Sequence, residues 1–144
     1  VKALKVVAGI ELGRRLFGSS EEGRPRILNS KQAYEFLRKI RVYKQEHLIA
    51  VYLNARYEVL KKRTINIGSL DSLSVSARDI LIPALECNCA YILIAHNHPS
   101  GDPSPSPEDI RMTKSLKKAV EIVGFKLLDH IVIAQKGWES VAIE

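Results

Sequence analysis

A short apolar run near the middle of the chain narrows the choice of folds. Residues 90–95 read AYILIA, so an extended backbone there would carry apolar side chains on both of its faces. That pattern is typical of a central strand covered by helices on each side. We therefore predict an α/β fold, with one mixed sheet flanked by helices and the strand at residues 90–95 in its centre.

Other patterns predict the remaining elements. Apolar residues at helical spacing, preceded by capping residues, predict helices at about residues 30–43, 77–86 and 107–123. Apolar runs separated by turn residues predict strands at 46–53, 57–67, 126–134 and 138–143, the first two of them as a hairpin.

The composition fits a single globular domain with an appended segment, because 46% of the 144 residues are hydrophobic and 26% are charged. Residues 1–17 have apolar positions near helical spacing, and residues 18–23 are typical of a flexible break. We predict an N-terminal helix and linker at residues 1–23 and a globular domain at 24–144. With no leader and no membrane-length apolar run, we expect a cytoplasmic protein without a membrane partner.

The apolar run leads directly into a loop that reads HNHPSGDPSPSPED. Residues two apart in an extended backbone point to the same face, so His96 and His98 can reach one ion. If Ser106 caps the next helix, the carboxylate of Asp109 can fold back toward the two rings. Two histidines and one carboxylate form a zinc-binding set that leaves a fourth position for water, as in catalytic sites.

Each of these residues also has a plainer interpretation. Ser106, Pro107 and the two acids that follow make a good helix start, which accounts for Ser106 fully and for Asp109 in part. The two histidines could be satisfied polar groups at a strand end. A metal-bound water also needs a general base, and composition does not separate the candidate carboxylates, which are Glu46, Glu58, Glu86 and Asp102.

The net charge does not identify a partner, and the cysteine content does not predict a disulfide. The net charge of +6, from 22 basic and 16 acidic residues, is compatible with acidic partners including nucleic acid. The densest basic run is at residues 61–63, where a solvated strand edge explains it as well as a phosphate contact does. Cys87 and Cys89 are too close in sequence for a good structural disulfide, so we expect reduced thiols in or near the core.

The loop motif resembles that of a known group of enzymes. Counted along the chain it is His-x-His-x7-Ser-x2-Asp, which is similar to the signature of the JAMM, or MPN-type, zinc metalloproteases. With ALECNCAYILIAHNH leading into it and KLLDHIVIA after it, the string resembles more closely the RadC family of bacterial JAMM-like proteins, long labelled DNA repair proteins. The likeness covers roughly residues 28–144 and implies a three-layer, cytidine-deaminase-like domain.

The resemblance implies roles by position. His96, His98 and Asp109 match zinc ligands. Ser106 matches the serine that helps to stabilise the oxyanion, and Glu46 matches the glutamate that acts on the zinc-bound water. The implied reaction is attack of this water on an amide or isopeptide carbonyl of a peptide or protein substrate. Residues 1–16 resemble the end of a helix-hairpin-helix region that precedes this domain in many RadC-like chains.

Two other functions compete with the peptidase. The first is a non-catalytic module for DNA repair or protein interaction, which the net charge favours and the presence of Glu46 and Ser106 disfavours. The second is a nuclease, suggested by the letters His-Asn-His, although phosphate-binding nuclease sites usually favour oxygen ligands for magnesium. DNA and DNA-repair proteins are candidate partners, and a sheet edge could form a homodimer or accept an extended peptide.

Overall fold

The computed structural model describes residues 6, 23–68 and 75–142. Except for residue 6, the predicted helix at residues 1–17 lies outside this part of the chain, and so does the last residue of the strand predicted at 138–143. The boundary that we place at residue 23, and the helix-hairpin-helix interpretation of the N-terminal segment, therefore stay predictions.

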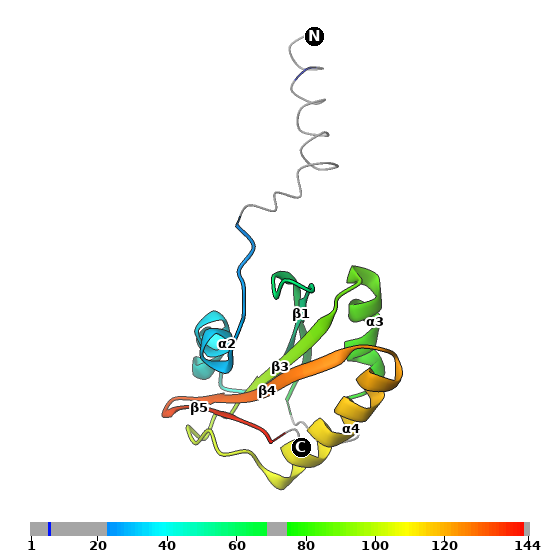
Figure 1. Ribbon diagram of the computed structural model, residues 1–144. Coiled ribbons are helices and arrows are strands. Elements are labelled where there is room, and N and C mark those ends of the chain that lie inside the picture. The colour runs from blue at the N-terminus through cyan, green and yellow to red at the C-terminus, as the bar shows by residue number, and fades with distance from the viewer. Residues whose placement is uncertain (1–5, 7–22, 69–74, 143–144) are drawn as a thin grey trace.

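The described elements form one five-stranded mixed sheet with helices on both faces (Figure 1). In chain order they are α2 (Ser30–Leu37), the 3₁₀ helix η1 (Arg38–Val42), β1 (His47–Leu53), β2 (Val59–Ile67), α3 (Ala77–Cys87), β3 (Tyr91–Asn97), α4 (Pro107–Ile122), β4 (Lys126–Ala134) and β5 (Gly137–Ser140). The strands lie in the order β2-β1-β3-β4-β5, so β3 is central, as predicted.

The connections explain the mixture of strand directions. β1 pairs antiparallel with both β2 and β3, and β4 pairs antiparallel with β5. β3 and β4 are parallel, and α4 is the crossover helix between them. The chain leaves β3 at Asn97 and enters α4 at Pro107. The first turn of α4 lies close to the end of β3, where His96 and His98 are.

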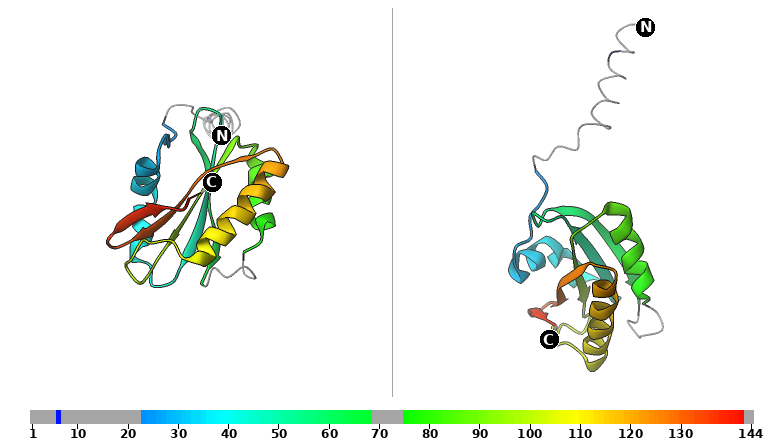
Figure 2. Two further views of the ribbon diagram at one scale, coloured as in Figure 1. Left: turned by 60° about the horizontal axis from the view of Figure 1, so that its bottom comes forward. Right: turned by 45° about the vertical axis from the view of Figure 1, so that its right-hand side comes forward.

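Alternate side chains of β3 fill two separate core layers. Ile92 and Ile94 pack with residues of α3 and α4, whereas Leu93 and Ala95 pack with residues of α2 and η1. Figure 2 shows α2 on one side of the sheet and α3 and α4 on the other. The apolar sequence of β3 is therefore explained by cover on both faces, which confirms the predicted three-layer α/β architecture.

The first predicted helix is only partly correct. The α-helix is capped by the Asn29 side chain, which accepts from the backbone N–H of Gln32, but it ends at Leu37 and the chain continues as a 3₁₀ helix. Leu37 and Ile40 are both buried. Leu37 is the N-cap of the 3₁₀ helix and Ile40 lies three residues later, a spacing that keeps both side chains on one face.

Two other expectations can be compared with the described residues. Cys87 and Cys89 are free thiols, Cys89 buried and Cys87 half-buried, as predicted. In the part of the chain that the structure describes, no helix has the length and apolar content needed to cross a membrane.

The central position of β3 gives a stability prediction. Ile94 is 0% exposed, so Ile94→Ala should lower the free energy of unfolding by about 2–5 kcal/mol, through lost burial and the cavity left behind. Ile122→Ala is the matched control, because Ile122 is 86% exposed, and should change stability by less than about 0.5 kcal/mol. Urea unfolding measures both, and equal losses in the two variants would contradict the core assignment.

Candidate metal centre

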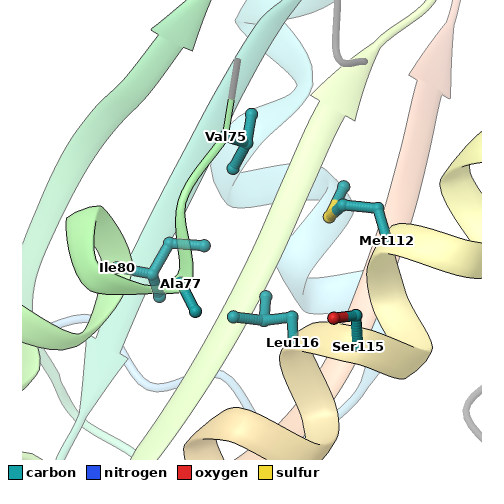
Figure 3. Close-up of a pocket in the computed structure, with 6 residues that line it drawn as sticks. All are labelled: Val75, Ala77, Ile80, Met112, Ser115 and Leu116. Atoms are coloured by element: carbon teal, nitrogen blue, oxygen red, sulfur yellow. The ribbon is translucent and has the colours of Figure 1, made fainter. Parts of the chain in front are cut away.

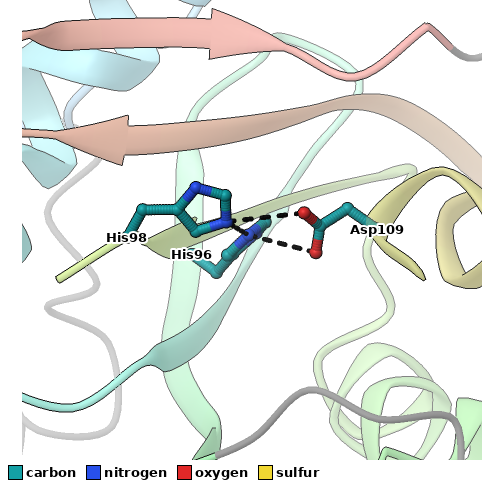
Figure 4. A group of neighbouring side chains, drawn as sticks. All are labelled: His96, His98 and Asp109. Carbon is teal, nitrogen blue, oxygen red and sulfur yellow. Dashed lines mark hydrogen bonds and ion pairs between the residues drawn. The ribbon is translucent and has the colours of Figure 1, made fainter. Parts of the chain in front are cut away.

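His96 and His98 lie at the end of the central strand. His96 follows Ile92 and Ile94 on the face that α3 and α4 cover, and it is fully buried. His98 follows directly after β3 and its side chain is 14% exposed. The two Nε2 atoms are 3.0 Å apart. The structure therefore brings the two histidines together, as their spacing predicts (Figure 4).

The first turn of α4 adds Asp109 to the histidines. Ser106 is the N-cap of α4, and its hydroxyl and its backbone N–H each donate to Asp109 Oδ2 at 2.7 Å. The backbone N–H of Asp109 donates to Ser106 Oγ at 3.1 Å, which completes a capping box. These bonds hold the carboxylate with Oδ1 3.2 Å from His96 Nε2 and Oδ2 3.4 Å from His98 Nε2.

The three side chains form a group that could hold a metal ion, since their ligand atoms all lie within 4.8 Å of one another. The other ring nitrogen of each histidine already has a partner: His98 Nδ1 donates to the backbone carbonyl of Asp102 at 2.9 Å, and His96 Nδ1 lies 2.8 Å from His130 Nε2. Both Nε2 atoms and a carboxylate oxygen are thus left facing one another.

The spacing of the group suits a tetrahedral ion. Two ligand atoms that are each about 2.0–2.1 Å from zinc lie about 3.3 Å apart at the tetrahedral angle. The observed separations are 3.0 Å between the two Nε2 atoms and 3.2 and 3.4 Å from these atoms to Asp109. The donor set, with two imidazoles and one carboxylate, is also one that zinc accepts.

The electrostatics of the group favour a cation at this point. Burial alone would raise the pKa of Asp109, but the contacts of its carboxylate with His96, His98 and Ser106 outweigh burial and hold that pKa well below its usual range. The hydrogen bond to Asp109 raises the pKa of His98, against the effect of burial. An ionised, buried carboxylate beside two ring nitrogens needs a positive partner, which either a proton or a metal ion can supply.

Glu46 lies immediately before β1, near the end of β3 that carries the histidines. Leu48, two residues further along, pairs with His96 in the antiparallel register of β1 and β3. The negative charge of Glu46 contributes to the raised pKa of His98, which is consistent with that position. Glu46 itself is half-buried. The pairing of β1 with β3 therefore brings Glu46 toward the loop, although the two are far apart in sequence.

The other carboxylates considered from the sequence lie elsewhere or are already engaged. Glu58 accepts from the Asn54 side chain in the turn at the far end of β1, and Glu86 on α3 pairs with Lys61 at 3.0 Å. The Asp102 carboxylate accepts from the backbone of Ser104 within the loop. Of these four acids, Glu46 is the one whose charge contributes to the raised pKa of His98.

Three buried polar residues around the site were missed by the sequence reasoning. Asn97 accepts from the backbone N–H of His47 at 2.8 Å and donates to the carbonyls of Tyr43 and Gln45, so it fixes the chain on both sides of Glu46. His130 on β4 and Thr113 on α4 lie behind His96. The only local signal for His130 was a polar residue inside the apolar strand pattern LLDHIVIA.

A small hollow lies between α3 and α4, on the same face of the sheet (Figure 3). Its volume of about 80 Å³ is enough for only a few water molecules. Apolar side chains make most of its lining, which consists of Val75, Ala77, Ile80, Met112, Ser115 and Leu116. None of the predicted site residues lines it, so it is separate from the metal group.

The lowered pKa of Asp109 gives a pH prediction for metal-free protein. A carboxylate with a depressed pKa in the folded state adds stability above its unfolded pKa of about 4 and loses that stability as the pH falls below it. Below about pH 4, Asp109 should therefore add up to about 1.4 kcal/mol per pH unit to the slope of unfolding free energy against pH. Urea unfolding in chelator between pH 2.5 and 5 should show a shallower slope for Asp109→Asn, and identical slopes would count against an ionised Asp109.

Comparison with known proteins gives a family for this chain and several relatives. A model of the RadC-like JAB domain family matches residues 27–144. A UPF0758 protein of Shouchella clausii is 45% identical over 133 residues, which cover 92% of this chain and 58% of that protein. A UPF0758 protein of Enterococcus faecalis is 41% identical over 145 residues, covering 100% of this chain and 62% of that protein.

A third relative gives a further match. A UPF0758 protein of Aquifex aeolicus is 42% identical over 135 residues, covering 94% of this chain and 58% of that protein. The chain thus spans about three fifths of the length of these curated relatives, whose shared name states no activity. Both the family match and the identity extend over most of the described residues, and the chain therefore belongs to the RadC family, with a RadC-like JAB domain at residues 27–144.

Proposed function

We propose that this domain is a zinc-dependent hydrolase that cleaves a peptide or isopeptide bond with metal-activated water. The observation that carries the proposal is the convergence of the two Nε2 atoms and the Asp109 carboxylate. The membership of a JAB-like family adds support. The proposal includes a cytoplasmic peptide or protein as the substrate.

In this proposal His96, His98 and Asp109 hold the zinc ion. When bound there, zinc would lower the pKa of a water ligand toward about 7 and polarise a substrate carbonyl. Asp109 enters the group as an anion, which its low pKa favours, and the two histidines enter as neutral ligands. Three protein ligands leave a position for water and substrate.

Glu46 is the proposed general base and acid. A half-buried carboxylate whose charge acts on His98 could accept a proton from the attacking water and return it to the leaving amine. Asn97 bonds to the backbone on both sides of Glu46, so the main chain that carries this residue is restrained.

Ser106 combines two roles in the proposal. Its hydroxyl donates to Asp109 Oδ2, so to stabilise a substrate oxyanion the same proton must turn toward the substrate. The backbone N–H of Ser106 also donates to Oδ2 at 2.7 Å and can keep the carboxylate in place during that change. The N-terminus of α4 adds a favourable dipole for an oxyanion.

A non-catalytic DNA-binding module receives less support from the described residues. In the basic run on β2, Lys61 pairs with Glu86 and Lys62 lies over the ring of Phe36 at 5.5 Å. These contacts fit the strand-edge interpretation of the run, since β2 is at the edge of the sheet. DNA, DNA-repair proteins and a second copy of the chain are kept as candidate partners.

Metal binding is tested first. Folded wild-type protein should take up about one zinc ion per chain, and His98→Ala and Asp109→Ala should each take up far less, because each loses a ligand. His47→Ala is the matched control, since His47 donates to the carbonyl of Gln45 and lies outside the group. Elemental analysis gives the stoichiometry and circular dichroism the folding. Wild-type protein that stays folded and takes up no zinc at micromolar concentration would overturn the proposal.

Hydrolysis is tested on the zinc-loaded protein with mixed fluorogenic peptides and lysine-linked isopeptides. Glu46→Gln should keep its zinc but lose about 10²–10⁴-fold in rate, because an amide cannot carry the proton. Glu86→Gln is the control, because Glu86 is an exposed residue of α3. Equal activity of Glu46→Gln and wild type would remove Glu46 from the mechanism.

A further inference from the structure

We propose that Thr113 and His130 are positioning residues that select the tautomer of His96, so that its Nε2 lone pair faces the metal group. This inference rests on the proposed metal site, although its first step concerns the metal-free protein. It follows from a chain of hydrogen bonds between three side chains that are each 0% exposed.

The chain of hydrogen bonds has four members and reaches His96 at Nδ1, the ring nitrogen that does not face the metal group. Thr113 Oγ1 donates to the backbone carbonyl of Asp109 at 2.6 Å. Thr113 Oγ1 also lies 2.5 Å from His130 Nδ1, and His130 Nε2 lies 2.8 Å from His96 Nδ1. The chain therefore begins at the main chain of one proposed ligand, Asp109, and ends at the ring of another, His96.

Donor and acceptor chemistry gives this chain one direction. A carbonyl oxygen only accepts, so the single hydroxyl proton of Thr113 is committed to Asp109. Thr113 Oγ1 must then accept from His130 Nδ1–H, which leaves Nε2 of a neutral His130 as an acceptor. His130 Nε2 accepts from His96 Nδ1–H, and the remaining nitrogen of neutral His96, Nε2, carries the lone pair.

If these hydrogen bonds ran in the opposite direction, His96 could not act as a metal ligand. If His130 donated from Nε2, neutral His96 would carry its proton on Nε2, which faces His98 Nε2 at 3.0 Å and Asp109 Oδ1 at 3.2 Å. That nitrogen could not then bind a metal ion. Thr113 thus acts on His96 across His130: it contacts the backbone carbonyl of Asp109, but it contacts no ligand atom of the metal group.

The position of His96 explains why the acceptor for its Nδ1–H is a side chain and not a backbone carbonyl. His98 lies in the loop, where the backbone carbonyl of Asp102 accepts from Nδ1 directly. His96 lies within β3, which is paired on both sides, so the backbone carbonyls around it belong to the sheet. A buried side chain from the neighbouring strand β4 supplies the acceptor instead, and Thr113 on the crossover helix orients it.

Two variants of Thr113 test the inference. Thr113→Val keeps the shape but can neither donate nor accept, so His130 loses the partner that sets its tautomer. We expect zinc affinity to fall about 10–100-fold in this variant. Thr113→Ser keeps the hydroxyl and should retain zinc affinity within about threefold. Competition titration with a zinc chelator measures both, and circular dichroism confirms folding.

A second measurement reads the tautomer without metal or activity. Nitrogen-15 NMR of metal-free wild-type protein at about pH 9, where ordinary histidines are neutral, should show the His96 proton on Nδ1. The same tautomer in Thr113→Ser and a mixed one in Thr113→Val would support the inference. A proton on Nε2 of wild-type His96, or unchanged tautomer and zinc affinity in folded Thr113→Val, would overturn it.

The two proposals fail in distinguishable ways. If wild-type protein takes up no zinc, the proposed function fails, while the NMR measurement still decides whether the chain sets the tautomer of His96. If zinc binds normally but Thr113→Val has no effect on either measurement, the positioning role fails and the metal site stands.

Discussion

Burial of β3 on both faces is the constraint on which the rest of this domain depends. Residues Ile92 to Ala95 are 0–2% exposed, which requires α2 on one side and α3 and α4 on the other. The same central position removes the polar residues at the end of β3 from water. His96 and Asn97 are both 0% exposed, and each is satisfied by partners that lie far away in sequence.

Strand alternation at this end explains why an asparagine lies between the two histidines. His96 points toward α4 and its proposed ligand Asp109. Asn97 points the opposite way, where it binds the chain that leads into β1 and so restrains Glu46. The three residues therefore act on two faces of the sheet, and the middle one is structural. This arrangement gives no reason to read His-Asn-His as a nuclease motif.

The Asp109 carboxylate has a structural role and a proposed ligand role at once. It completes the capping box of α4, and it faces the two histidines. Oδ2 takes both donors of Ser106, and Oδ1 is left toward His96. The start of α4 and the position of the ligand are thus set by the same bonds. An ionised carboxylate at 4% exposure is tolerated there because hydrogen bonds and the helix N-terminus compensate for lost hydration.

The sequence by itself determined the central strand, the start of α4 and the proposed metal ligands, because strand alternation and helix capping are local patterns. The ligands His96, His98 and Asp109 all lie within one strand end, one loop and one helix start. Glu46 and the oxyanion role of Ser106 were assigned by resemblance, and the approach of Glu46 to the site depends on the pairing of β1 with β3. Only the tertiary structure decided the roles of Asn97, Thr113 and His130. Their hydrogen bonds join elements up to 54 residues apart, and these contacts depend on sheet register and on the packing of a crossover helix, which no local pattern encodes.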